Sequence, residues 1–185
     1  MTNENLGDYG EFVSPHEVRL IRIVPAPIER VWGFLTDSEK RATWLAEGPM
    51  DLRVHGRVYL KFNHALLSPR EATPEKYKED GLELQFEGVI EKCEAPNLLE
   101  FTWQAGSEVC FELTPLGEET RIVLVHKGLK SIEETVSVAA GWHVHTAYLT
   151  ARLAGQEPPL FWVNHARLED DYATRLAAVG SATER

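Results

Sequence analysis

The chain has 185 residues, of which 43% are hydrophobic and 26% are charged, a composition typical of one globular domain. A chain of this length buries roughly 70% of the surface that it exposes when unfolded, so it needs neither disulfides nor a structural metal for stability. With 19 Lys and Arg against 29 Asp and Glu, its formal charge of −10 repels phosphate and anionic lipid, which argues against nucleic acid and membranes as partners.

Neither a membrane span nor a secretion signal is expected. No apolar run approaches the roughly 20 residues that a spanning helix needs. The N-terminus, MTNENLGDYGE, is acidic where a signal peptide is basic and then apolar. We therefore expect a cytoplasmic protein. Because cytosolic thiols are normally reduced, Cys93 and Cys110 are interpreted as free thiols.

The first elements of the chain are a strand and two short helices. Residues 17–24, EVRLIRIV, predict a strand that is partly covered on both faces. Residues 25–45 then predict two short amphipathic helices. Pro27 suits the first turn of the first helix, and Asp37 or Ser38 can cap the second.

The middle of the chain predicts an antiparallel sheet. Residues 56–64, GRVYLKFNH, alternate strictly between apolar and polar, with Phe62 and His64 on one face. Residues 65–81 are polar and punctuated by proline, as in a lid or a loop that carries a short helix. Residues 82–129 contain four strand-like runs separated by short turns, which predict a meander.

Residues 131–153 contain no proline and predict a long helix. One stripe of this helix carries Val138, Gly141, Trp142, His145, Tyr148 and Leu149. Gly155 can end the helix, and the two prolines that start at Pro158 prevent its continuation. A second amphipathic segment follows, with apolar residues spaced three or four apart.

These elements divide the chain into three parts. Residues 1–15 lack periodicity and are interpreted as a flexible lead-in. Residues 16–156 predict an α+β domain in which a bent antiparallel sheet of about six or seven strands closes around the long helix, leaving an apolar cavity between them. Residues 157–180 predict an extra C-terminal helix that packs on the domain or on a partner subunit, so a homodimer is one expectation.

Five segments in a fixed order carry a family resemblance, and they span roughly residues 17–155. They are VPAPIERVWGFLTDSEKRATWL, GRVYLKF, GVIEKCEAPNLLEFTW, GEETRIVLVHKGL and AAGWHVHTAYLTARLAG. With them the chain resembles the START-like or SRPBCC superfamily, in the branch related to the activator of Hsp90 ATPase. The resemblance implies the helix-grip, Bet v 1-like fold. It implies a function among those of the superfamily, which includes lipid carriers, aromatic-polyketide cyclases and hormone receptors.

Candidate ligand-binding residues come from the inward positions of the sheet and of the long helix. The apolar wall is predicted to contain Trp44, Phe62, Phe86, Trp103, Phe111, Trp142 and Leu149. The polar groups that would orient a ligand are His64, His126, His145 and Tyr148, with Glu100 nearby. His126 shares a face with Ile122 and Leu124, which directs it towards the mouth of the cavity.

Metal and thiol chemistry are not predicted. His143 and His145 are two apart on a helix, so they point roughly 200° from each other and cannot share an ion. Neither cysteine has a histidine at a position that fixes a pair. We expect no metal and no cofactor.

Three functions are compatible with these residues. The first is binding of a small hydrophobic or aromatic molecule without catalysis. The second is a cyclase or hydrolase type of enzyme with His126 or His145 as its acid-base group. The third, which rests on the resemblance, is regulation of a chaperone ATPase.

Overall fold

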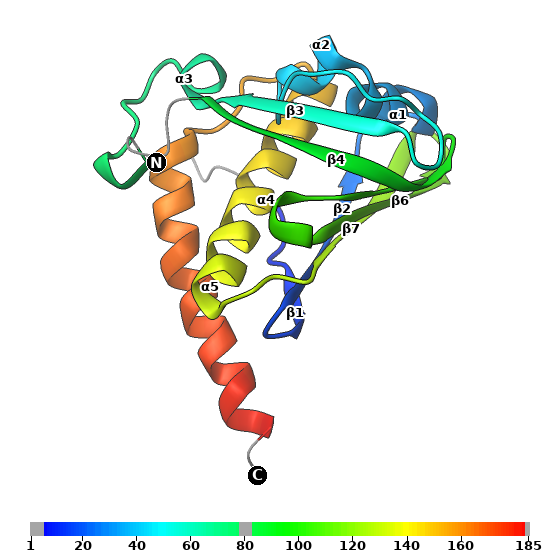
Figure 1. Ribbon diagram of the computed structural model, residues 1–185. Helices are drawn as coiled ribbons and strands as arrows, with labels where there is room; N and C mark the ends of the chain where they lie inside the picture. The colour runs from blue at the N-terminus through cyan, green and yellow to red at the C-terminus, as the bar shows by residue number, and fades with distance from the viewer. Residues whose placement is uncertain (1–5, 78–82, 184–185) are drawn as a thin grey trace.

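One bent antiparallel sheet of seven strands dominates the computed structural model, which describes residues 6–77 and 83–183 (Figure 1). The strand order is β1-β2-β7-β6-β5-β4-β3. The strands are β1 (Glu11–Ser14), β2 (Glu17–Val24), β3 (Arg57–Asn63), β4 (Glu83–Glu94), β5 (Leu98–Thr102), β6 (Glu108–Leu116) and β7 (Glu119–Lys127). The predicted α+β class and helix-grip arrangement are confirmed.

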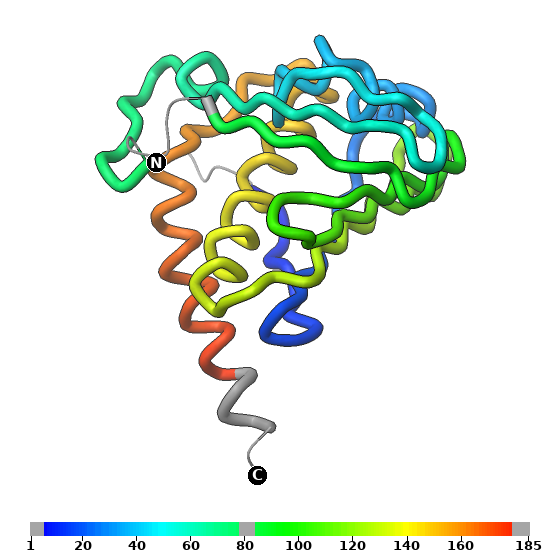
Figure 2. The backbone as a smooth tube through the Cα atoms, in the orientation of Figure 1, coloured from blue at the N-terminus to red at the C-terminus, as the bar shows by residue number. Residues whose placement is uncertain are grey.

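Helices lie at the ends and on the concave side of the sheet. In the described residues they are α1 (Ile28–Thr36), α2 (Ser38–Ala42), α3 (His64–Leu67), α4 (Ile132–Leu153) and α5 (Phe161–Thr183), with short 3-10 turns η1 (Glu75–Tyr77) and η2 (Gln104–Gly106). The sheet curves around α4, and α5 runs along the side of α4 that the sheet leaves open (Figure 2). None of these helices has the length and apolar character needed to cross a bilayer.

Strand alternation places the core as the sequence predicts, with one difference. In β2, Leu20 and Arg22 point inward and are buried. Ile21 and Ile23 point outward and are exposed, because no element in the described part of the chain covers the outer face of the sheet there. The expectation that this strand is partly covered on both faces is therefore wrong.

Local capping explains where the helices begin. Pro27 is the N-cap residue of α1, one position before the predicted first turn. The Asp37 side chain accepts a hydrogen bond of 2.9 Å from the backbone N–H of Lys40, which makes it the N-cap of α2. At α4, Ser131 Oγ accepts a bond of 3.1 Å from the N–H of Glu134.

The fold begins earlier than the sequence indicates. β1 pairs with β2. The whole of β1 lies within residues 1–15, which the sequence predicts to be a flexible lead-in. Just before β1, the Tyr9 hydroxyl donates a bond of 2.6 Å to Asp171, and the Gly10 N–H donates a bond of 2.7 Å to the Tyr172 hydroxyl. These partners lie 162 residues along the chain, so no local pattern could reveal them.

α5 packs on α4 of its own chain. It begins at Phe161 rather than at residue 157, because Pro158 and Pro159 cannot continue a hydrogen-bonded helix. Its buried residues include Leu168 and Tyr172, as the spacing predicts. The helix therefore belongs to the intramolecular core, while a homodimer stays a prediction.

The polar segment after β3 forms a strap that we define as residues 64–77. It carries α3 and η1, so the prediction of a short helix in this region is confirmed. Arg70 pairs with Glu157 at 3.0 Å, and Lys76 pairs with Glu169 on α5 at 3.0 Å. The strap is thereby fixed to α5. Residues 78–81 of the predicted lid lie outside the described residues.

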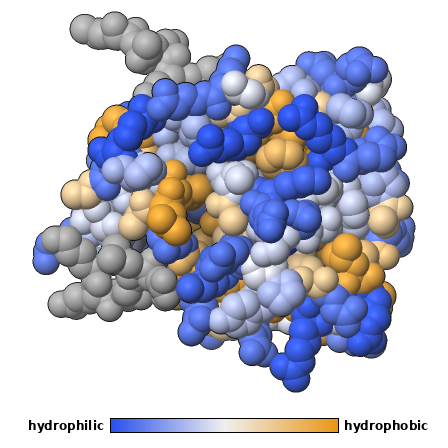
Figure 3. All heavy atoms as spheres, turned by 90° about the horizontal axis from the view of Figure 1, so that it is seen from above, coloured by the Kyte–Doolittle hydropathy of each residue, from blue (hydrophilic) through white to orange (hydrophobic). Residues whose placement is uncertain are grey.

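Seen from above, the surface is mainly hydrophilic, with small separate groups of hydrophobic residues (Figure 3). Leu66 in the strap and Val163 on α5 are among the exposed apolar side chains. Scattered apolar residues of this kind are ordinary on a protein surface.

Candidate functional site

A cavity of about 110 Å³ lies between the concave face of the sheet and α4. Its lining residues are Leu45, Phe62, Trp103, His126, Val138, Gly141, Trp142 and His145. Most of the wall is apolar, and histidines supply its ionisable groups. The predicted position of the cavity, under the stripe of the long helix, thus holds in the structure.

His126 is fully engaged by its neighbours. The Trp142 Nε1–H donates a bond of 2.9 Å to His126 Nδ1. Since an indole N–H can only donate, the neutral imidazole carries its proton on Nε2, which donates to Ser107 Oγ at 2.9 Å. The Ser107 hydroxyl in turn donates to the Gln104 carbonyl at 2.9 Å. His126 therefore has no nitrogen left for a ligand.

His145 keeps one nitrogen without a protein partner. Its Nδ1 lies 2.7 Å from the Trp44 carbonyl, so Nδ1 carries the proton and donates. Nε2 then holds a lone pair, and it makes no hydrogen bond to any described residue. In contrast to His126, His145 can accept a hydrogen bond from a bound molecule.

Burial keeps both cavity histidines uncharged. It lowers the pKa of His126 to about 3. Burial, followed by the influence of His64, lowers the pKa of His145 to about 3. At neutral pH the cavity therefore presents hydrogen-bonding groups and no cation.

Aromatic rings in tilted and edge-on contact form the sheet side of the site. The Trp103 ring centroid lies 5.2 Å from that of Trp142, 5.8 Å from Phe62 and 4.5 Å from Phe86. Phe111 packs edge-on against Trp142 at 5.7 Å. Phe86 and Phe111 thus support the wall from behind and do not line the cavity.

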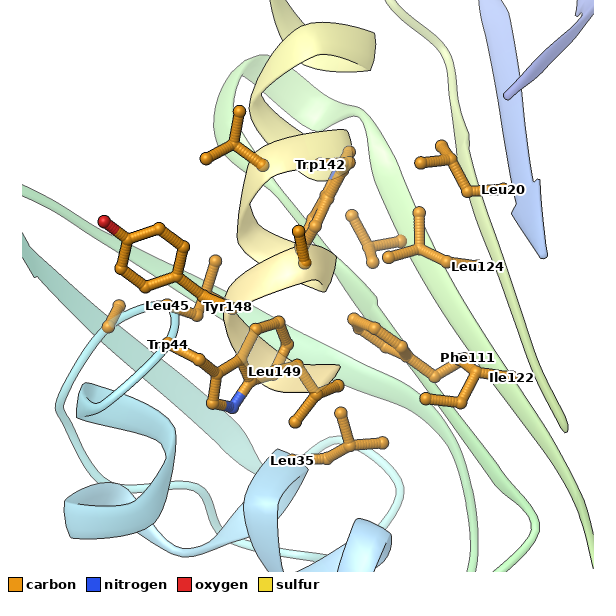
Figure 4. Packing of buried hydrophobic residues seen from close by; sticks show 14 of the residues in the cluster. Leu20, Leu35, Trp44, Leu45, Phe111, Ile122, Leu124, Trp142, Tyr148 and Leu149 are labelled. Atoms are coloured by element: carbon orange, nitrogen blue, oxygen red, sulfur yellow. The ribbon is translucent and has the colours of Figure 1, made fainter. Parts of the chain in front are cut away.

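Three predicted ligand-binding residues belong to the packed core instead. Trp44 is fully buried and donates its Nε1–H to the Phe34 carbonyl at 2.8 Å. Leu149 packs beside it, and Tyr148 points away from the sheet, towards Phe161 of α5 (Figure 4). Large side chains fill this end of the interior, so these three residues do not line the cavity.

His64 lies beside the cavity and not in its wall. Its ring stacks on Phe62 with centroids 6.0 Å apart and also contacts His145 at 5.7 Å. The residues that sequence reasoning missed are Leu45, Val138 and Gly141. Val138 and Gly141 lie on the predicted stripe of α4. Helical periodicity alone could therefore have placed both residues in the cavity wall.

Glu100 lies on the opposite face of the sheet, which overturns its placement near the ligand. Its carboxylate pairs with Lys92 at 2.7 Å and with Lys127 at 3.1 Å. Both cysteines are free thiols, as predicted, and both are partly buried. Burial is the main cause that raises the pKa of Cys110 to about 11, so this thiol is not activated as a nucleophile.

The two histidines of the His-x-His pair face different partners. His143 Nδ1 lies 2.9 Å from the Tyr172 hydroxyl, on the α5 side of α4, whereas His145 lines the cavity. No group of three or more His, Cys, Asp or Glu side chains in the described ranges is arranged to hold a metal ion.

A larger hollow of about 520 Å³ lies beside β2. Its lining includes exposed Ile21 and Ile23, polar side chains of the N-terminal segment, and Arg22. Arg22 Nε donates to Thr146 at 3.1 Å and Nη1 donates to the Asp8 carbonyl at 2.8 Å, while its buried Nη2 makes no hydrogen bond to a described residue. The cavity under α4 has the more apolar wall and carries the aromatic side chains, so we regard it as the candidate site.

A family model described as Activator of Hsp90 ATPase homolog 1-like protein matches residues 25–154. The chain belongs to this AHSA1-like family. The matched region runs from α1 to the end of α4, so it contains every residue of the cavity wall. β1, β2 and α5 lie outside it. Among curated proteins, none matches the sequence.

Several solved structures are similar to this chain. A protein from Bordetella parapertussis is 40% identical, with a TM-score of 0.78, and the match covers 92% of this chain and 91% of that one. CalU16 from Micromonospora echinospora is 24% identical over 88% of this chain and 86% of its own, with a TM-score of 0.62. A conserved protein of unknown function from Enterococcus faecalis is 15% identical over 95% and 93% of the two chains, with a TM-score of 0.68. The last two show the fold alone.

Proposed function

We propose that this AHSA1-like protein binds a small hydrophobic or aromatic molecule in the cavity under α4. The observation that carries the proposal is the cavity itself, about 110 Å³ in volume and walled by aromatic and aliphatic side chains. An engineered apolar cavity of about 150 Å³ in another protein binds benzene. The volume here suits one small ring or a short aliphatic chain.

The absence of a side chain at Gly141 contributes to the space. This glycine lies within α4 and lines the cavity. A Cβ placed on it would have one neighbour at the limit of contact, Nε2 of His165 at 4.0 Å. A larger residue at this lining position therefore meets no backbone clash at its Cβ, which offers a way to reduce the space of the site.

The matched control is Gly33 in α1. It is also a helical glycine, and a Cβ there would meet the flexible Lys40 side chain at 3.5 Å, an ordinary contact. Gly33 does not line the cavity. Replacing either glycine by leucine raises helix propensity by up to about 1 kcal/mol, so the two variants have the same local effect on the backbone.

Toluene is the probe that tests the proposal. We expect it to shift the indole N–H resonance of Trp142 in NMR titrations of the wild type and of Gly33→Leu. In Gly141→Leu the shift is lost, because leucine occupies the same volume. An unchanged response of Gly141→Leu, or no response of the wild type at millimolar toluene, contradicts the proposal.

Acid-base catalysis has weaker support. Groups that exchange protons in catalysis work best with a pKa near the operating pH, and the pKa of His145 is about 3. The test is the turnover of an identified substrate by His145→Gln. If the variant turns over the substrate as fast as the wild type, His145 takes no part in the mechanism.

Regulation of a chaperone ATPase is a second proposal, favoured by the family model that matches residues 25–154. It predicts that the purified protein changes the ATPase rate of an Hsp90-type chaperone. A rate that stays constant over a wide range of added protein contradicts it.

A further inference from the structure

We propose that the natural ligand carries a hydroxyl group on an aromatic or apolar body, and that this hydroxyl binds between His145 and Trp162 in the place now taken by the His64 ring. The inference rests on the proposed function, because it assigns the polar part of the same ligand. It uses a residue of α5, Trp162, which lies outside the region that the family model matches.

Trp162 holds a buried donor with no acceptor among the described residues. The residue is 7% exposed, and its buried Nε1–H makes no hydrogen bond within residues 6–77 and 83–183. Leaving such a group unpaired is unfavourable, because the N–H loses its hydrogen bond to water and gains none in the protein. Unpaired buried donors are rare in folded proteins, and a bound molecule is one of the explanations for them.

His145 supplies the complementary acceptor. Its proton is directed to the Trp44 carbonyl at 2.7 Å, so the lone pair of Nε2 is available. A hydroxyl is the smallest neutral group that can donate to this nitrogen and accept from an indole N–H at the same time. The donor and acceptor left over by the protein therefore match an alcohol or a phenol.

The His64 ring contacts the rings of both residues. Its centroid lies 5.7 Å from that of His145 and 5.1 Å from that of Trp162. It also stacks on Phe62 of the cavity wall at 6.0 Å. No hydrogen bond from a described residue holds the ring, and the side chain is half-buried on the short helix α3. Rotation of His64 would extend the cavity by about the size of one ring.

The charge of the surroundings favours a neutral ligand. Burial, and after it His165, lowers the pKa of His64 to about 4, so the ring is uncharged at neutral pH. The nearby cations are paired, Lys76 with Glu169 at 3.0 Å and Arg70 with Glu157 at 3.0 Å. Arg70 and Lys76 are thus already paired with carboxylates of the protein, whereas a hydroxyl needs no cation.

The test compares 2-naphthol with 2-methylnaphthalene, which have nearly the same size and differ in the hydroxyl. We expect the wild type to bind 2-naphthol roughly tenfold more tightly, the effect of one or two hydrogen bonds to buried partners. Trp162→Phe keeps an aromatic ring and removes the N–H, so the preference falls to threefold or less. Trp32→Phe on α1, outside the cavity, keeps the full preference.

His64→Ala provides an independent test, because it removes the ring and keeps both hydrogen-bonding partners. We expect both probes to bind it more tightly than they bind the wild type, with the hydroxyl preference retained. In the wild type, 2-naphthol should also shift the indole N–H resonance of Trp162, whereas 2-methylnaphthalene should not. This measurement uses the wild type alone, so it does not depend on whether a variant folds.

The outcomes separate the two proposals. Equal binding of the two probes by the wild type, or a preference that survives in Trp162→Phe, overturns the hydroxyl site and leaves the cavity proposal standing. Failure of both naphthalenes and of toluene to bind either the wild type or His64→Ala overturns the proposed function, and the hydroxyl site with it.

Discussion

The Trp142 Nε1–H donates a 2.9 Å hydrogen bond to Nδ1 of His126, which joins α4 to β7 in the wall of the cavity. The bond fixes the tautomer of His126, because its other nitrogen must then donate to Ser107. It also fixes the Trp142 ring, which forms part of the cavity wall. A histidine that the sequence suggested as a ligand contact thus positions an aromatic wall.

This relationship predicts the effect of Trp142→Phe. The change leaves Nδ1 of His126 buried without a donor, which costs about 1–3 kcal/mol in the free energy of unfolding, besides the packing lost with the smaller ring. Urea denaturation measures it. Trp32→Phe, at a half-buried position outside this network, serves as the control and should lose less than half as much. Equal losses would show that the bond to His126 contributes nothing.

The buried histidines predict lower stability in mild acid. Burial holds the pKa of His126 and of His145 at about 3 and that of His143 at about 4. Below pH 6.5 the unfolded chain takes up protons that the native protein does not, so this stability is fully present above pH 6.5 and is lost as the pH falls towards these values. From pH 7 to pH 5 the loss is about 2 kcal/mol for each histidine.

A His145→Gln variant tests that dependence. The substitution removes one proton-binding group from the unfolded state. Between pH 7 and pH 5, the free energy of unfolding of the variant should therefore fall by about 2 kcal/mol less than that of the wild type. His55 is exposed, and His55→Gln is the control. A pH dependence identical in His145→Gln and in the wild type would contradict the account.

Glu71 predicts how firmly the strap holds α5. Its carboxylate accepts hydrogen bonds from the backbone N–H groups of Phe161, of Trp162 at 3.1 Å and of Val163 at 3.0 Å. We expect Glu71→Ala to lower the free energy of unfolding by about 1–3 kcal/mol, since it leaves the first turn of α5 uncapped.

The control for Glu71 is Glu157→Ala, which breaks an exposed ion pair with Arg70. Exposed pairs contribute less than about 1 kcal/mol, so this variant should stay close to the wild type in the same denaturation experiment. A larger effect of Glu157→Ala than of Glu71→Ala would reverse our interpretation of the strap.

Strand parity and helical period predicted much of the site. Alternation put His126 inside together with Ile122 and Leu124, and the helical stripe put Trp142 and His145 under the sheet. Both signals depend on the nearest neighbours in the chain. They are therefore reliable for the direction of a side chain.

The same signals did not indicate that Tyr148 and Leu149 lie outside the cavity wall. Leu149 is seven residues after Trp142, which places it on the same face but about 10 Å further along the axis, where Trp44 and Leu35 fill the interior (Figure 4). Tyr148 faces α5, because α4 is covered by the sheet on one side and by α5 on the other. A helix that is buried on both sides has no polar face, so its sequence pattern cannot show which apolar side faces the sheet.

The anchoring of the N-terminal segment could not be predicted from local pattern, and it gives a further prediction. The Tyr9 ring lies under the Arg175 guanidinium at 3.7 Å, and its hydroxyl donates to Asp171 at 2.6 Å. We expect Tyr9→Ala to lower the free energy of unfolding by about 2 kcal/mol. Stability equal to that of the wild type would show that the segment before β1 is the loose lead-in that the sequence suggested.

The central claim is that a small apolar molecule occupies the cavity under α4. Intermolecular nuclear Overhauser effects from the methyl protons of bound toluene test it most directly. We predict contacts to the ring protons of Phe62 and Trp142 and to the methyl groups of Val138, which line the cavity. Contacts to Ile21 and Ile23 in the surface hollow beside β2, or no contacts at saturating toluene, would contradict the claim.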